Sequence, residues 1–223
     1  MSSQSTIPPT IARSWLLHPA DQPERFAEAV NSEVDVVVLD VEDGCRQSEK
    51  ERARREVRQW LEAGNQAWLR INDARSPEWE KDLLALGHCP GLAGVMLAKT
   101  ENAEHVALTA SRLAADTPIV ALVESADGLQ QAAEIAGADQ VVRLAFGVGD
   151  FRRDTGIGAS NIALAYARSQ FVLASRVGRV APPIDGPTLS TDTKVIRDAA
   201  EHALEMGMTG KLCLDPEQPL VIN

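Results

Sequence analysis

The sequence predicts a (β/α)₈ barrel, an α/β fold in which parallel strands alternate with helices around a closed sheet. Eight short apolar runs alternate with seven helical patterns, with one unit roughly every 25 to 30 residues. The segments at 35–40 and 118–124 each contain a continuous apolar run that ends in a carboxylate, as expected for strands buried on both faces. No Gly-x-Gly-x-x-Gly motif follows the first strand, which disfavours the alternative of an open doubly wound sheet.

The first half of the chain supplies four strand–helix units. The first apolar run ends before a proline, and Asp21 with a proline two residues later marks the start of a helix. A β-branched run predicts the second strand. In chain order we expect a strand at 14–18, a helix at 21–30, a strand at 35–40, a helix at 48–62, a strand at 67–72, a helix at 76–86, a strand at 94–99 and a helix at 102–115.

The second half continues the alternation. We expect a strand at 118–124, a helix at 126–136, a strand at 141–150, a helix at 162–177, a strand with prolines at 180–185, a helix at 192–206 and a strand at 210–215. The polar, proline-containing residues 1–12 are predicted to be a flexible lead, and residues 13–223 a single barrel domain. We expect the last barrel helix and a C-terminal lid to be absent. A barrel with an uncovered flank predicts a homo-oligomer, a trimer or a hexamer.

Composition excludes several classes of protein. A formal net charge of −10 disfavours general binding to nucleic acids or anionic membranes. No stretch reaches the ~18 apolar residues of a membrane span, and the N-terminus lacks the apolar core of a signal peptide. Three widely spaced cysteines are expected to be reduced thiols, which predicts a cytoplasmic protein.

Charged and polar side chains gather where the predicted strands end, and barrel enzymes build their active sites at this end. The residues at these positions are Asp40, Glu42, Asp43, Arg70, Asn72, Lys99, Glu124, Asp150, Asp185 and Asp215. Such a rim suits a metal ion and a carboxylated ligand. His18, at the end of the first strand, could also reach the site.

Glu124 and Asp150 are predicted on neighbouring strands, at the same end of the sheet. Two carboxylates brought together repel unless a cation or a shared proton compensates them. Two carboxylates with waters and substrate oxygens are a common way to hold Mg²⁺. The alternative is that each acid caps the helix that follows it.

Arg70 is predicted to grip a substrate carboxylate, because a planar guanidinium binds a carboxylate through two hydrogen bonds. The alternative is a structural ion pair with Asp40 or Glu42. Those two acids and Asp43 are expected to surround the arginine, and Glu42 is a candidate for holding a metal-bound water. Lys99 could act in the site or only balance nearby acids.

These segments resemble the citrate lyase β-subunit-like proteins of the HpcH/HpaI aldolase family, within the phosphoenolpyruvate/pyruvate-like barrels. The matching motifs are RSWLLHPAD at 13–21, PERF at 23–26, VLDVED at 38–43, LRIN at 69–72, ALVES at 121–125, LAFGVGD at 144–150, YARS at 166–169 and GKLCLDP at 210–216. The resemblance implies a Mg²⁺-dependent carbon–carbon lyase, or the reverse condensation, acting on 3-hydroxyacyl thioesters such as citryl-, malyl- or citramalyl-CoA.

The resemblance also implies residue roles. It assigns Glu124 and Asp150 to Mg²⁺ and Arg70 to the substrate carboxylate. We accordingly predict Arg70 and Glu42 as catalytic residues, and Arg70, Glu124 and Asp40 as substrate-binding residues. Gln22 and Glu28 stand where relatives commonly have the Arg and Lys of a CoA-binding pair, and Asp215 stands where they have His.

Two other functions are compatible with the sequence. A class II pyruvate aldolase acting on 2-keto-3-deoxy acids would share the metal and the arginine, but it uses a His after the second strand. This chain has residues 40–45 there, without His. A non-catalytic barrel subunit is the remaining alternative.

Overall fold

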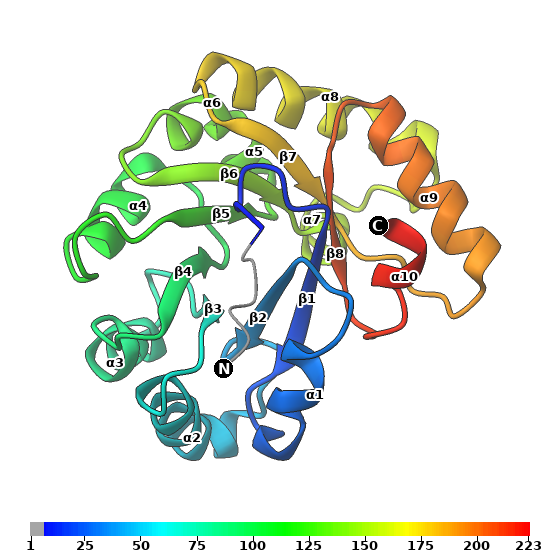
Figure 1. Cartoon of the computed structure of the whole chain (residues 1–223). Coiled ribbons are helices and arrows are strands. Elements are labelled where there is room, and N and C mark those ends of the chain that lie inside the picture. The colour runs from blue at the N-terminus through cyan, green and yellow to red at the C-terminus, as the bar shows by residue number, and fades with distance from the viewer. Residues whose placement is uncertain (1–6) are drawn as a thin grey trace.

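Eight parallel strands close into a barrel in the computed structural model, which describes residues 7–223 (Figure 1). The strands follow chain order around the barrel, and β1 pairs with both β2 and β8. They are β1 Ser14–Pro19, β2 Val36–Asp40, β3 Ala67–Ile71, β4 Leu92–Leu97, β5 Ile119–Val123, β6 Val141–Phe146, β7 Ala181–Asp185 and β8 Gly210–Cys213. The predicted barrel is confirmed, and the open sheet is wrong.

Helices surround the strands, as Figure 1 shows. The α-helices are α1 Phe26–Val30, α2 Lys50–Glu62, α3 Pro77–Leu86, α4 Ala103–Ala110, α5 Ala126–Gln130, α6 Ala132–Ala136, α7 Val148–Thr155, α8 Asn161–Val177, α9 Thr193–Glu205 and α10 Pro219–Ile222. Short 3₁₀ helices at Pro23–Arg25 and Gln47–Glu49 lead into α1 and α2. Across residues 7–223, none of the helices has the length and apolar character needed to cross a membrane.

Two predicted helices differ from those observed. The helix expected at 126–136 is divided into α5 and α6, because Gln131 takes φ −93° and ψ 1° and interrupts the helix. The helix expected at 102–115 ends at Ala110. There the Ser111 hydroxyl donates to the Leu108 carbonyl at 2.8 Å, a local hydrogen bond that competes with helix continuation.

The two faces of each strand serve different cores. One cluster fills the barrel interior, and its largest members are Trp15 and Trp68, whose rings meet edge to face at 5.1 Å between centroids. A second cluster fills the layer between the strands and the helices. Because side chains alternate along a strand, every second residue of each strand faces the barrel axis.

A fully buried arginine lies near the start of β6. Arg143 donates to the carbonyls of Pro9, Ala12, Pro182 and Pro183, at 2.7 to 3.4 Å, and also to the Thr209 hydroxyl. Burial lowers the pKa of Arg143 to about 10, so the guanidinium keeps its charge at neutral pH.

Through these bonds Arg143 joins the segment before β1 to the start of β7 and β8. The predicted flexible lead was residues 1–12. Residues 1–6 lie outside the described part of the chain, whereas Pro9 and Ala12 contact the barrel through Arg143.

Replacing Arg143 by Met is expected to lower the free energy of unfolding by about 3 kcal/mol, because several buried acceptors lose their donor at once. Urea unfolding followed by circular dichroism measures this change. Arg58→Met, at an exposed position on α2, should change it by less than about 0.5 kcal/mol. Equal effects of the two variants would contradict the role given to Arg143.

Candidate active site

Strand alternation and register bring three of the predicted site residues to one layer at the barrel mouth. Asp40 pairs with Arg70 across β2 and β3, and both follow inward-facing residues two positions earlier, Val38 and Trp68. Glu124 follows inward-facing Leu122 at the end of β5 in the same way. The carboxyl ends of the strands therefore present Asp40, Arg70 and Glu124 toward the barrel axis.

Arg70 lies in a two-pronged ion pair with Asp40. Its Nε donates to Asp40 Oδ1 at 2.8 Å and its Nη2 to Asp40 Oδ2, while its Nη1 is 3.5 Å from Glu42 Oε2. Burial lowers the pKa of Arg70, but the charge of Asp40, with those of Glu42 and Glu124, outweighs it and holds the pKa above its usual value. The guanidinium is therefore charged and fixed in orientation.

Asp40 also shapes the loop that follows β2. Its carboxylate accepts from the backbone N–H groups of Glu42 and Gly44, both at 2.9 Å. A Cβ atom at position 44 would overlap this carboxylate, so only glycine fits there. The loop thereby places buried Glu42 beside Arg70.

Lys99 lies between the loop after β2 and the first turn of α7, and it contacts acids on both. Its Nζ contacts Glu42 Oε1 and lies 3.3 Å from Asp43 Oδ2 and 3.8 Å from Asp150 Oδ2. Burial lowers the pKa of Lys99, but Glu42, with Asp43 and Glu124, outweighs it and raises the pKa above its usual value. Lys99 has φ 49°, a left-handed conformation rare for a side-chain-bearing residue, and its N–H donates to Glu124 Oε1 at 2.9 Å.

The Glu124 carboxylate is buried beside a second acid. Burial, and then the charge of nearby Asp150, raises the pKa of Glu124 to about 8. A Cβ atom at position 147 would overlap the Glu124 carboxylate, so glycine at this position lets the chain pass the carboxylate closely. Burial also raises the pKa of Glu42, against the lowering effect of Arg70 and Lys99.

Asp150 does not end a strand, contrary to the strand predicted at 141–150. Strand β6 ends at Phe146, and Asp150 lies in the first turn of α7. The turn at Gly147 ends the ladder, and the apolar run continues into a helix. Arg153, one helical turn further on, pairs with Asp150 at 2.8 Å and keeps an exposed side chain, as expected for a basic pair at 152–153 on a solvated surface.

A buried polar network supports the site from behind. Lys50 Nζ donates to the carbonyls of Val41 and Glu42 and to Asn72 Oδ1, at 2.6 to 2.9 Å. Asn72 in turn donates to fully buried Asp82 at 2.7 Å. Asn72 was predicted at the rim and instead belongs to this network. Nothing in the sequence distinguishes Lys50 from the other charged residues of α2.

Glu124, Asp150 and Lys99 line a pocket of about 320 Å³ at the barrel mouth. Its remaining lining residues, none of them predicted, are Arg75, Glu101, Ser125, Arg153 and Asp154. Arg153 and Asp154 follow Asp150 by three and four positions on α7, and this helical spacing is the sequence feature that could have placed them in the pocket.

Three predicted rim residues lie elsewhere. Asp185 follows inward-facing Ile184, so it points outward and pairs with Arg168 and Lys211, each at 3.0 Å. Asp215 accepts from the Glu217 N–H at 2.9 Å in the turn after β8. His18 packs on Phe26, with ring centroids 5.7 Å apart, and burial lowers its pKa.

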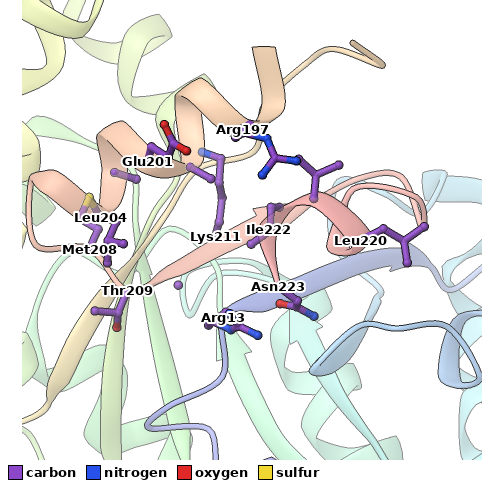
Figure 2. A pocket seen from close by; sticks show the side chains of 14 residues that line it. Arg13, Arg197, Glu201, Leu204, Met208, Thr209, Lys211, Leu220, Ile222 and Asn223 are labelled. Carbon is purple, nitrogen blue, oxygen red and sulfur yellow. The ribbon is translucent and has the colours of Figure 1, made fainter. Parts of the chain in front are cut away.

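A second pocket, of about 350 Å³, lies between α9, β8 and α10 (Figure 2). Figure 2 shows Arg13, Arg197 and Lys211 around it, together with apolar side chains of α9 and α10. It touches the first residues of β8 rather than the ends of the strands. None of the predicted site residues lines it.

The mouth residues fit a divalent cation. Among residues 7–223 there is no group of three or more His, Cys, Asp or Glu side chains arranged to hold a metal ion. The two predicted donors, Glu124 and Asp150, could hold an ion such as Mg²⁺ that keeps several water ligands. Seven carboxyl side chains at the mouth face four cationic side chains, an imbalance that a dication would reduce; these residues are Asp40, Glu42, Asp43, Glu101, Glu124, Asp150, Asp154, Arg70, Arg75, Lys99 and Arg153.

The closed barrel and the charged groups at its mouth define an enzyme of the (β/α)₈-barrel type. The family model of the HpcH/HpaI aldolase/citrate lyase proteins matches residues 13–216. The chain belongs to this family, and it is a carbon–carbon lyase.

The relatives bear on the chemistry. The "Citrate lyase subunit beta-like protein" of Mycobacterium tuberculosis is 35% identical over 94% of this chain and 77% of its own length. The "L-malyl-CoA/beta-methylmalyl-CoA lyase" of Rhodobacter capsulatus is 26% identical over 99% of this chain and 80% of its own. The citrate lyase β subunit of M. tuberculosis, solved with oxaloacetate and magnesium, superposes with a TM-score of 0.82 at 32% identity, covering 96% of each chain.

Proposed function

We propose that this protein is a Mg²⁺-dependent lyase that cleaves, or forms, a 3-hydroxy carboxylic acid CoA thioester such as citryl-, malyl- or citramalyl-CoA. The products of cleavage are a keto acid and an acyl-CoA. One observation carries the proposal: Glu124 and Asp150 share a pocket at the barrel mouth, with Arg70 in the same layer as Glu124. The magnesium and oxaloacetate held by one relative, and the malyl-CoA lyase activity named for another, support it.

Glu124 and Asp150 would hold the metal, which when bound polarises the substrate oxygens. Arg70, oriented by Asp40, would bind the substrate carboxylate through the side of its guanidinium that faces Glu42. Cleavage of a 3-hydroxy thioester leaves an enolate, so a fixed positive charge at the mouth stabilises the charge that develops. Fixing the substrate by its carboxylate also orients the bond that breaks.

Glu42 is the proposed proton-handling residue. It is buried, its pKa is raised, and it contacts Arg70 and Lys99 together. A carboxyl held beside the substrate-binding arginine is placed to act as a general acid or base. Asp40 would act through Arg70, by fixing the direction in which the guanidinium points.

The segment at residues 22–28 bears on the acyl carrier. Gln22 and Glu28 replace the basic pair expected of a CoA site, and Glu28 is paired with Arg25 at 3.1 Å. Arg25 is thus the basic side chain available in this segment. We also propose that the chain forms homo-oligomers.

A substrate panel tests the function. The full chain with Mg²⁺ is incubated with citryl-, malyl- and citramalyl-CoA, with the corresponding free acids, and with 2-keto-3-deoxy acids, and keto-acid release is measured. Release from at least one CoA thioester, abolished by EDTA and restored by Mg²⁺, is the expected result. Release from the keto-deoxy acids alone would favour a pyruvate aldolase, and no release from any thioester would overturn the proposal.

Mg²⁺ affinity is expected to increase with pH. Below about pH 8 Glu124 holds a proton in the metal-free protein, and the metal must displace it. The apparent Kd should therefore fall by up to about tenfold per pH unit as pH rises toward 8, and then level off.

Isothermal titration calorimetry in two buffers of different ionisation enthalpy measures the affinity and the number of protons released. Proton release should be largest below pH 8. A Kd that stays constant from about pH 6 to 9 would show that Glu124 is already ionised in the metal-free protein.

A further inference from the structure

The longest helix carries an exposed apolar stripe that nothing in the described chain covers. On α8, Ile162, Tyr166, Leu173 and Val177 are 85%, 65%, 58% and 71% exposed. At 100° per residue these four positions fall within about 60° of one another on the helix surface. The opposite face already packs inward through Leu164, Ala167, Phe171 and Ala174. Figure 1 shows α8 at the outside of the molecule.

The spacing of this stripe is symmetric about its own centre. The four residues are separated by four, seven and four positions, so Ile162 and Val177, and likewise Tyr166 and Leu173, are equidistant from the point between Ser169 and Gln170. Two copies of a helix that cross antiparallel at that point place residue 162 of one against residue 177 of the other, and residue 166 against residue 173. Such self-complementarity is what a two-fold axis requires.

The remaining residues of the α8 face permit close approach. Ser169 and Gln170 are half-buried, uncharged and lie at the crossing point. Arg176 is the charged residue at the edge of the stripe, and the same symmetry sets it opposite Ala163 rather than opposite another charge. Small or uncharged groups at a crossing point let two helix axes come within 8 to 10 Å.

The apolar area is sufficient for association. The four side chains together expose roughly 500 Å² of surface, near the upper limit for a patch on a monomeric protein. Two copies would bury roughly 1,000 Å² through these residues alone, which reaches the lower range of specific interfaces. Tyr166, the chain's one tyrosine, would lie within the contact, and tyrosine is enriched among residues that dominate binding energy.

We propose that the outer face of α8 is a two-fold interface with a second copy of this chain, centred between Ser169 and Gln170. The contact alone gives dimers, and combined with a three-fold contact it gives hexamers. The proposal concerns assembly, and it stands or falls independently of the chemistry proposed above.

A charge-pair experiment tests it. Sedimentation velocity and light scattering give the mass of the full chain, and of Tyr166→Lys and Leu173→Glu, over a range of micromolar concentrations. Each variant alone should halve the mass of the assembly. Mixing the two should restore the original mass, because residue 166 of one variant faces residue 173 of the other. Leu84→Lys, at an 87% exposed position on α3, is the matched control and should leave the mass unchanged.

Disulfide trapping tests the same contact without placing charged residues in the interface. Ser169→Cys lies beside the proposed axis and should form a disulfide-linked dimer on mild oxidation, whereas the unmodified chain should not. Cys45 and Cys213 are buried and Cys89 is half-buried, which limits their own cross-linking. A monomeric wild-type chain, or an assembly whose mass neither charge variant changes and which Ser169→Cys does not trap, would overturn the proposal.

Discussion

Replacement of Glu124 or Asp150 by Ala is expected to lower turnover at least about 10³-fold and to abolish Mg²⁺ binding. Each variant removes one of the two proposed metal ligands, and the single ligand that remains holds the ion poorly against its water shell. Glu124→Ala also leaves the Lys99 N–H without the hydrogen-bond acceptor that Glu124 provides. Steady-state rates, with Mg²⁺ titrations by calorimetry, measure both effects.

The matched control is Asp154→Asn. Asp154 lines the same pocket, and its Oδ2 accepts from the Ala126 N–H at 2.8 Å, a bond that the asparagine oxygen preserves. This variant should keep its rate within a few-fold. Full activity in either Glu124→Ala or Asp150→Ala would remove the metal site from the mechanism.

Arg70→Ala is expected to lower both stability and activity. Removing the guanidinium leaves Asp40 buried without its partner, which should reduce the free energy of unfolding by about 3 to 5 kcal/mol. Loss of the substrate clamp should lower kcat/KM by about 10² to 10³-fold. Arg70→Lys keeps the charge but not the two-pronged geometry, so it should restore stability more than activity.

A second substitution separates the two roles. In Arg70→Ala with Asp40→Asn, the unpaired buried charge is removed, so most of the lost stability should return while kcat/KM stays low. Urea unfolding and steady-state kinetics on the four members of this cycle provide the comparison. If activity recovered together with stability, Arg70 would be a structural residue only.

Much of the barrel mouth follows from strand periodicity. The number and order of the strands follow from the alternating runs, and the period of two places Asp40, Arg70 and Glu124 inward at the strand ends. The same period explains the error at Asp185, which follows an inward-facing residue and so must face α8. In that case position at a strand end alone was a poor guide to the direction of the side chain.

Other parts of the site depend on geometry that no local pattern encodes. Residues 144–149 carry no polar or charged side chain, so the change from strand to helix at Gly147 is set by the turn and not by hydrophobicity. The left-handed backbone of Lys99 and the contact of Lys50 with Asn72 arise only when segments distant in sequence meet. Arg153 is a surface residue in the sequence reading and in the structure, and only the turn of α7 places it beside Asp150.

The two glycines beside the site carboxylates have a consequence for mutational tolerance. Positions 44 and 147 have no room for a single added carbon beside Asp40 and Glu124. In a saturation library selected for activity, both positions should therefore appear as intolerant as the acids themselves. The sites that constrain future variation of this enzyme thus include two residues that have no side chain with which to take part in the reaction.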